Sequence, residues 1–216
     1  NLIEHDFGGE VRPLYNGNLA QTSWKSDSDN IVRSYGYKYD DLNRLKKGIY
    51  ERNSIVTHSY DETLDYDKNG NIIKLKRNGY YDNVNTGTAF PIDELYYGYD
   101  GNSNKLLYVH DQTNSTEGFK DGNMFGNDYE YDDYGNMTQD NNKNIGKIFY
   151  NHLNLPVKIE FNTGGQNVIE YLYNAVGLKI SKTVTSTTPQ TGTGLNKTVY
   201  LSGFQYKNNV LQFFPT

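Results

Sequence analysis

The sequence contains no cysteine, only five prolines and one tryptophan. Without cysteine the chain can build neither a disulfide framework nor a thiolate metal site. No stretch approaches the roughly 18 consecutive apolar residues that a membrane-spanning helix needs. The net charge of −5 offers no basic face to follow a phosphate backbone, so we expect no nucleic-acid binding.

Helix signals are scarce as well. Alanine is nearly absent, and no window of a dozen residues carries the apolar stripe of an amphipathic helix. Tyrosine is abundant instead, with 21 residues against nine phenylalanines. Tyrosine suits a half-buried pleated surface, because its ring packs while its hydroxyl stays hydrogen-bonded or hydrated. The composition therefore predicts an all-β protein with very little helix.

A short unit recurs along almost the whole chain. Its clearest copy is Tyr129-Glu130-Tyr131-Asp132-Asp133-Tyr134-Gly135-Asn136-Met137, and fainter copies begin at Tyr15 and Tyr206. The key tyrosines are separated by 27, 33, 32, 19 and 23 residues, which indicates a fixed core joined by connections of variable length. The six key tyrosines are Tyr39, Tyr66, Tyr99, Tyr131, Tyr150 and Tyr173.

Each copy predicts a β-hairpin. Residues before the key tyrosine alternate, as in Tyr35-Gly36-Tyr37-Lys38-Tyr39, which is the period of a strand. The following Asp or Asn can accept a hydrogen bond from the backbone two residues on, and the Gly or Asn after it tolerates positive φ. We assign a structural role to the repeat residues Tyr39, Asp40, Tyr66, Asp67, Gly70, Tyr99, Asp100, Tyr131, Asp132, Gly135, Tyr150, Asn151, Tyr173, Asn174 and Gly177.

Three segments interrupt the hairpins, at Asn78–Pro91, Asp111–Asn127 and Thr183–Asn196. Their Gly, Ser, Thr and Asn content indicates loops or long hairpin tips. We interpret them as tolerated insertions, with recognition loops on a rigid scaffold as the alternative.

The many carboxylate pairs, such as Asp40-Asp41, Asp61-Glu62 and Asp132-Asp133, do not predict an enzyme. A glycosidase needs one pair across a cleft, whereas these carboxylates recur at turns, where Asp and Asn are interchangeable caps. The four histidines, His5, His58, His110 and His152, have no partners at metal-ligand spacing. We predict no catalytic residues and no cofactor.

One metal site is worth stating as a hypothesis. Asp65, Asp67 and Asn69 supply oxygen at the first, third and fifth positions of a calcium loop, and Gly70 stands at the sixth. Lys76 occupies the twelfth position, which rules out the helix-loop-helix site and leaves only a looser calcium site on a β-turn.

The unit Tyr-Asp-x-x-Gly-Asn/Arg-Leu resembles the YD repeats of bacterial Rhs proteins, Tc toxin shell subunits and animal teneurins. Leu14–Trp24 followed by Arg33–Leu45 looks like Rhs proteins of the Bacteroidetes kind. The resemblance covers residues 1–216 as one repeat region, which we expect to be a fragment of a longer chain. It implies an array of antiparallel hairpins in a curved, spiralling sheet that forms part of a hollow shell.

In that family the shell encapsulates a C-terminal toxin or effector. The resemblance therefore implies a structural, non-enzymatic wall segment of a secreted or cell-surface polymorphic toxin, whose partners are the remainder of the shell and the enclosed toxin domain. Nothing in the chain matches the self-cleaving segment that usually closes such shells. A piece of wall has cut sheet edges, so edge-to-edge self-association is expected.

The alternative is an extracellular carbohydrate-binding or adhesin-type module. Aromatic rings beside Asn and Asp suit sugars, because a ring face packs on C–H groups while amides pair with hydroxyls. Trp24, Tyr80, Tyr81 and Asn83 are the candidate glycan contacts. The competing interpretation is that the tyrosines are cross-strand packing partners.

Overall fold

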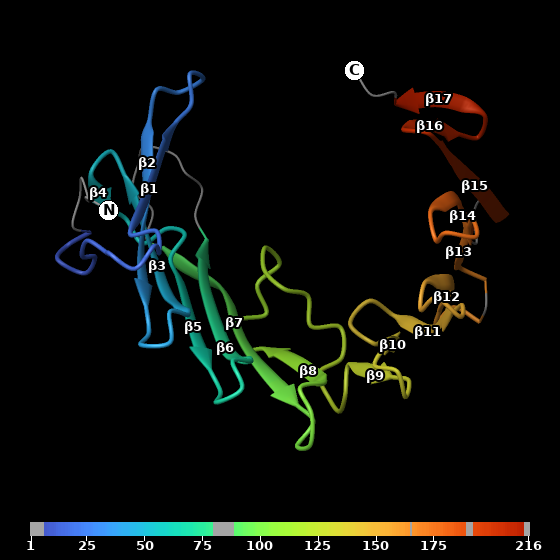
Figure 1. The fold of residues 1–216 in the computed structure, drawn as a ribbon, viewed down its shortest axis with the longest axis horizontal. Helices are drawn as coiled ribbons and strands as arrows, with labels where there is room; N and C mark the ends of the chain where they lie inside the picture. The colour runs from blue at the N-terminus through green and yellow to red at the C-terminus, as the bar shows by residue number, and fades with distance from the viewer. Residues whose placement is uncertain (1–6, 80–88, 165, 189–191, 214–216) are drawn as a thin grey trace. The chain divides into compact units, whose positions relative to one another are not determined.

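A computed structural model describes residues 7–79, 89–164, 166–188 and 192–213. Every regular element among these residues is a β-strand (Figure 1), so the all-β prediction is confirmed. The chain divides into two compact units, Asn1–Asp121 and Gly122–Thr216. No helix among the described residues is long and apolar enough to cross a membrane.

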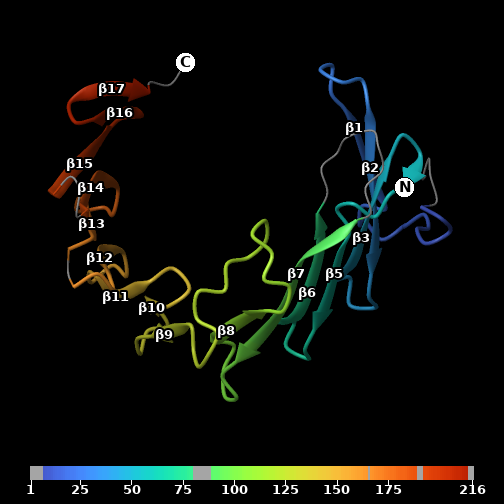
Figure 2. The same ribbon diagram turned by 180° about the vertical axis from the view of Figure 1, so that it is seen from behind.

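The first unit is an eight-stranded antiparallel sheet with the order β1-β2-β3-β5-β6-β7-β8, and β4 pairs with β3. Figure 2 shows the same strands from behind. The strands are β1 (Gln21–Lys25), β2 (Val32–Tyr39), β3 (Leu45–Arg52), β4 (Ile55–Val56), β5 (Glu62–Tyr66), β6 (Ile72–Gly79), β7 (Phe90–Tyr99) and β8 (Leu106–Asp111).

The second unit is a nine-stranded antiparallel sheet in which every strand pairs with the next strand of the sequence. This order is what consecutive hairpins produce. The strands are β9 (Tyr129–Tyr131), β10 (Met137–Asp140), β11 (Ile145–Tyr150), β12 (Pro156–Phe161), β13 (Val168–Tyr173), β14 (Lys179–Thr188), β15 (Gly192–Leu201), β16 (Phe204–Lys207) and β17 (Val210–Phe213).

Strand register shifts at the key tyrosines. In β5 and β6 the pairs run Leu64 with Leu75 and Asp65 with Lys74, and then skip a residue to pair Tyr66 with Ile72. Such a bulge gives the strand an extra local twist. The same shift occurs at Tyr39, Tyr99, Tyr150 and Tyr173.

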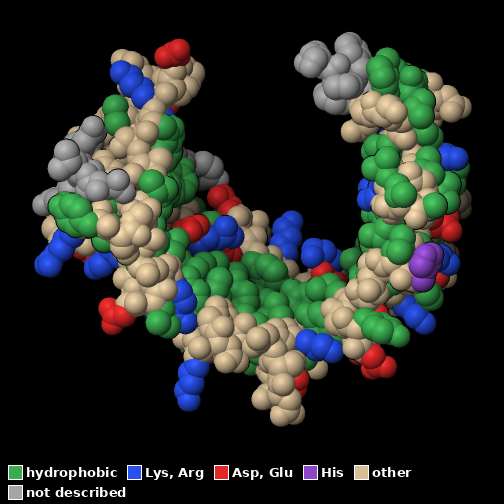
Figure 3. Space-filling model, viewed as in Figure 1, with side chains coloured by type: hydrophobic (Ala, Val, Ile, Leu, Met, Phe, Trp, Pro, Cys, Tyr) green, Lys and Arg blue, Asp and Glu red, His purple; other side chains and the backbone are tan. Residues whose placement is uncertain are grey.

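The hydrophobic core is small and lies mostly in the first unit. Phe7, Val11 and Ile49 form a buried cluster, and Gly36 leaves room for it, because a Cβ there would lie 2.5 Å from both Phe7 and Val11. Hydrophobic side chains also gather over β7 and β8 (Figure 3). Among the described residues of the second unit, Tyr129 is the one hydrophobic residue that is buried.

For one of the predicted interruptions, the structure decides between a loop and a long hairpin tip. Within Thr183–Asn196, residues of β14 and β15 pair as far as Thr188 with Gly192, so this segment is a long hairpin tip and not a loop. The many Thr, Ser and Gly residues of this segment give it a loop-like composition, which hides the two strands in the sequence.

The faint copies also differ from the full unit. No strand runs through residues 11–20, and Asn208 and Asn209, both at positive φ, make a tighter turn between β16 and β17.

Candidate functional site

The turns that follow the key tyrosines share one hydrogen-bond pattern. In the turn of Asp67, carboxylate Oδ1 accepts from the backbone N–H of Asn69 at 2.9 Å and of Asn71 at 2.8 Å. Gly70, the residue between them, has φ of +91°. The same two bonds form at Asp40, Asp132, Asn151 and Asn174. A side chain and a positive-φ residue thus fix each turn locally.

The residue four positions after the turn cap links two turns. Arg44 donates from Nε to Asp40 Oδ2 at 2.7 Å in its own turn and from Nη1 to the Asp67 carbonyl at 2.9 Å in the next. Asn136 does the same with Asp132 Oδ2 at 2.9 Å and with Asn154 Oδ1 at 3.0 Å. These contacts explain why Asn or Arg stands at this position of the unit.

The key tyrosine ties its repeat to the preceding one. The Tyr66 hydroxyl donates to the carbonyl of Leu45 at 2.7 Å, and Leu45 is the residue that follows the preceding turn. The equivalent bonds are Tyr39 to Leu19, Tyr99 to Ile72, Tyr150 to Met137 and Tyr173 to Pro156, at 2.7–3.0 Å. Sequence reasoning missed these acceptors, because any residue supplies a carbonyl. We call each such bond a tyrosine latch.

Burial favours the protonated form of four latch tyrosines. Desolvation raises the pKa of Tyr39, Tyr66, Tyr150 and Tyr173 above the ordinary tyrosine value. The hydroxyls of these four tyrosines therefore stay protonated across the physiological range.

One copy departs from the turn pattern. The turn of Asp100 is one residue longer, with Asp100 N–H bonded to the Lys105 carbonyl at 2.9 Å and Ser103 Oγ to Asp100 Oδ2 at 2.7 Å. Tyr131 lies in β9, and burial raises its pKa too.

Buried aspartates form a second set, which the sequence did not reveal. Asp93 is fully buried, and its carboxylate accepts from Arg77 Nε at 2.7 Å and from the Phe119 N–H at 2.6 Å. The buried aspartates are not the caps that follow the key tyrosines. They stand at no fixed distance from those tyrosines, so the repeat pattern of the sequence does not identify them. The others are Asp61, Asp111, Asp128 and Asp140.

The calcium candidates already have partners within the protein. Both oxygens of Asp67 bond within its turn, Asp65 pairs with Lys46, and Asn69 Nδ2 donates to Asn104 Oδ1 at 3.0 Å. In the described part of the chain, no three His, Cys, Asp or Glu residues cluster as metal ligands. These contacts give the calcium hypothesis no support.

The candidate glycan contacts are only partly described. Trp24 is 42% exposed in the edge strand β1 and stacks on Tyr35 at 5.9 Å between ring centroids. Tyr35 in turn stacks on Tyr37 at 6.1 Å, so Trp24 is part of a cross-strand aromatic row. Tyr80, Tyr81 and Asn83 lie outside the described residues.

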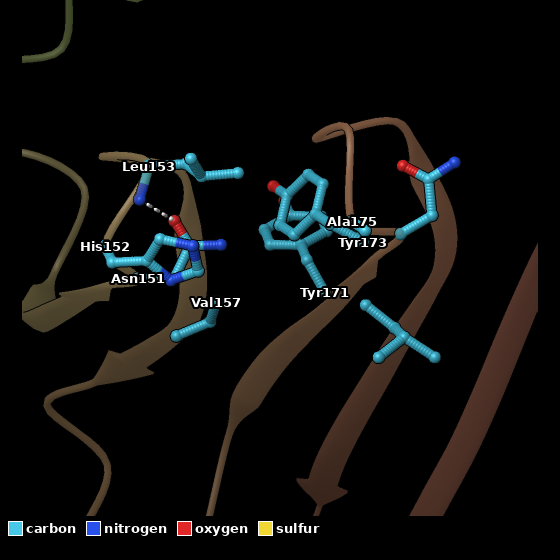
Figure 4. Close-up of a pocket in the computed structure, with 9 residues that line it drawn as sticks. Asn151, His152, Leu153, Val157, Tyr171, Tyr173 and Ala175 are labelled. Carbon is cyan, nitrogen blue, oxygen red and sulfur yellow. Dashed lines mark hydrogen bonds between the residues drawn. The ribbon is translucent and has the colours of Figure 1, made fainter.

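The second unit holds a groove of about 410 Å³ between the turns of Asn151 and Asn174. Asn151, Leu153 and Val157 lie on one side, and Tyr171, Tyr173 and Ala175 on the other (Figure 4). We call it the Asn151–Asn174 groove. His152, Leu172 and Asn174 complete its lining.

No protein-family model and no curated protein matches the chain. Among solved structures, the crystal structure of TcdB2-TccC3-Cdc42 matches 89% of this chain at a TM-score of 0.54 and 11% identity. The crystal structure of TcdB2-TccC3-TEV matches 86% at a TM-score of 0.33 and 10% identity. The chain spans 11% and 14% of those two chains.

The first of these similarities is one of fold. The chain is similar in fold to part of TcdB2-TccC3-Cdc42. The Bacteroidetes assignment stays a prediction, because an identity of 11% carries no closer relationship.

Proposed function

We propose that this chain is a non-enzymatic wall segment of an Rhs-type shell, which encloses a C-terminal toxin or effector domain of a longer polypeptide. The main support is that each unit consists of consecutive hairpins. Within a unit, tyrosine latches and turn-to-turn hydrogen bonds join each hairpin to its neighbour. Such a sheet grows by adding repeats, which is what a wall requires.

The small core supports the same function. Ordinary domains bury two packed layers around one hydrophobic centre, yet only nine hydrophobic residues of the described chain are buried. Strand pairing, turn caps and latches are therefore the main sources of order. A barrier one sheet thick covers the most area for a given number of residues.

The sheet edges indicate how the segment joins its neighbours. Strands β1 and β8 are the edges of the first sheet, and β9 and β17 those of the second. Edge strands offer unpaired N–H and C=O groups to a further strand. In the longer protein, further repeats would pair at β1 and β17, and the isolated segment would self-associate through its free edges.

Limited proteolysis with intact-mass analysis of the full natural polypeptide tests this function. We expect the repeat region to resist protease and a separate C-terminal fragment to remain bound to it without denaturant. An exposed C-terminal domain that is digested at the rate of the same domain alone would contradict the enclosure. Secretion is part of the proposal, and detection of the polypeptide in culture medium or on intact cells tests it.

A further inference from the structure

The sequence contains three Asn-Gly dipeptides, at Asn16-Gly17, Asn69-Gly70 and Asn78-Gly79. Asparagine before glycine readily loses its side-chain amide, because glycine has no Cβ to keep its backbone nitrogen away from the preceding side chain. The reaction requires that nitrogen to approach the asparagine Cγ. Hydrogen bonds and strand pairing therefore decide which of the three sites can react.

Two of the sites are fixed by the fold. The Gly70 N–H donates to the carbonyl of Asp67 at 3.3 Å within its turn. Gly79 is buried at the end of β6 and pairs with Phe90 of β7. A glycine that is held in a turn or a strand pair cannot swing its nitrogen toward the preceding side chain, so we expect Asn69 and Asn78 to be protected.

The third site is open. Asn16 and Gly17 are both exposed and lie in the irregular segment of residues 11–20. The Gly17 N–H has no hydrogen-bond partner in the part of the chain that the structure describes. No atom outside its immediate neighbours lies within 4 Å of where a Cβ of Gly17 would be. The backbone nitrogen of Gly17 is thus free to move.

The side chain of Asn16 is held in a geometry that favours attack. The Asn18 N–H donates to Asn16 Oδ1 at 3.1 Å, which folds the side chain back along the backbone of Gly17. Because a backbone N–H can only donate, this bond also identifies the amide oxygen. A donor at that oxygen stabilises the negative charge that the oxygen acquires when Cγ is attacked.

Water has access to the same amide. Asn16 lines a groove of about 430 Å³ together with Tyr39, Asp40 and Asn43. Asn16 Nδ2 donates to Asn43 Oδ1 at 2.7 Å, so the group that would leave as ammonia also lies at this groove. The groove supplies the one co-reactant that hydrolysis needs, which is water.

We propose that Asn16 is a site of spontaneous covalent modification, which converts it to aspartate and isoaspartate. The Gly17 nitrogen gives its proton to hydroxide and bonds to Asn16 Cγ, the Cγ–Nδ2 bond breaks, and Nδ2 takes a proton from water and leaves as ammonia. One water then opens the resulting cyclic imide at either carbonyl, which yields aspartate or isoaspartate. Nothing is oxidised or reduced, and the reaction does not depend on the enclosure of a toxin.

The product should loosen the segment of residues 11–20 from the sheet. A carboxylate cannot donate to Asn43 Oδ1, and it places oxygen against oxygen across a contact that measures 2.7 Å before the reaction. The same segment is bound to β2 through the Tyr37 N–H, which donates to the Ala20 carbonyl at 2.9 Å. Exchange of the Tyr37 amide hydrogen therefore reports the loosening.

Incubation of the 216-residue chain at mildly alkaline pH, followed by peptide mapping, tests the proposal. Loss of the amide raises the mass of a peptide by about 1 Da, and chromatography separates the aspartate and isoaspartate forms. Synthetic peptides with the three local sequences give reference rates. We expect Asn16 in the folded chain to react at least as fast as in its peptide, and Asn69 and Asn78 at least about tenfold more slowly than in theirs.

Two results would overturn the proposal. One is protection of Asn16 equal to that of Asn69 and Asn78. The other is main-chain cleavage after Asn16 as the dominant product, since that would mean attack by Nδ2 on the Asn16 carbonyl and not by the Gly17 nitrogen on Cγ.

Substitutions locate the reaction. In Asn16→Gln the amide is kept, but the larger cyclic imide closes far more slowly, so we expect ammonia loss at this position to disappear. Ammonia loss at the original rate would refute the assignment. If that variant does not fold, Asp67→Ala remains informative, because it uncaps the turn that holds Gly70 and should speed the loss at Asn69. An unchanged rate at Asn69 would mean that the fold does not select the site.

The consequence for the fold is tested with the product itself. Asn16→Asp is expected to speed hydrogen exchange at the Tyr37 amide at least about twofold. The control is Asn102→Asp, which adds the same charge at an exposed turn residue and should leave that exchange rate unchanged. Equal rates in the two variants would refute the loosening.

Discussion

Replacing Tyr66 by phenylalanine tests whether the latches hold the array together. The change removes only the hydroxyl, which donates to the Leu45 carbonyl at 2.7 Å. The ring stays, and with it the packing under the Arg44 guanidinium, which lies 4.6 Å from the ring centroid. Any effect therefore reports the latch and not the loss of an aromatic side chain.

The expected cost follows from the position of this latch. A neutral hydrogen bond contributes about 0.5–1.5 kcal/mol, and for a chain of this size 1 kcal/mol lowers the melting temperature by about 2–4 °C. Strands β3 and β5 pair through only two residue pairs, Lys47 with Thr63 and Gly48 with Glu62. The latch is a large share of the contact between these strands, so we expect a cost near 1 kcal/mol.

Urea unfolding measures the total loss of unfolding free energy, and amide hydrogen exchange shows which strands lose protection. Exchange should accelerate at Lys47 and Thr63 and remain unchanged in β13 to β15, because repeat arrays couple through nearest neighbours. The control is Tyr134→Phe, since Tyr134 is 84% exposed in its turn and makes no latch. If both variants unfold at the same urea concentration, the latch contributes nothing and the reasoning is refuted.

Three further perturbations test other parts of the molecule. Gly135→Val should destabilise its hairpin by about 1–3 kcal/mol, because φ at this residue is +86°. An added Cβ meets no atom within 4 Å, so the cost is backbone strain and not a steric clash. An unchanged melting temperature would contradict this. Arg77→Met leaves the Asp93 carboxylate buried without its cation. The free energy of unfolding measured in urea should fall by about 3–5 kcal/mol, and a fall below about 1 kcal/mol would disprove this. The side-chain hydrogen bond from Asn71 lowers the pKa of Asp67. The stabilisation of that turn is therefore present above the unfolded pKa, near about 4, and is lost as pH falls through the folded pKa. The asparagine cap of the Asn174 turn does not titrate, so acidification to pH 3 should speed hydrogen exchange in the Asp67 turn relative to the Asn174 turn.

The hairpins could be predicted from the sequence because their determinants are local. The turn cap, its two backbone donors and the positive-φ residue all lie within five consecutive residues, as in Asp67 to Asn71. Side-chain identity alone specifies such a turn. The alternating residues on either side then fix which strands pair.

The latches and the buried aspartates could not be predicted in the same way. The Tyr66 hydroxyl bonds to a backbone carbonyl 21 residues away, and a carbonyl has no sequence identity. Asp93 needs Arg77 from β6 and the N–H of Phe119 from an irregular segment, so its role appears only after the strands are paired. The Asn151–Asn174 groove was missed because its amides look like ordinary turn caps.

Comparison of the two kinds of turn separates what caps a turn from what joins neighbouring turns. Asn151 and Asn174 keep both Oδ1 bonds, at 2.9–3.1 Å, although leucine replaces the Asn or Arg that pairs with the cap elsewhere. The hydrogen bond from the fourth residue to the cap is therefore not needed to form the turn. The role of that fourth residue must lie in its bond to the next turn, such as the bond from Arg44 to Asp67. Between the two Asn turns that link becomes apolar, since a Cβ at Gly177 would lie 3.2 Å from Leu155 Cδ1. An array that can exchange a polar link for an apolar one therefore keeps its strand pairing.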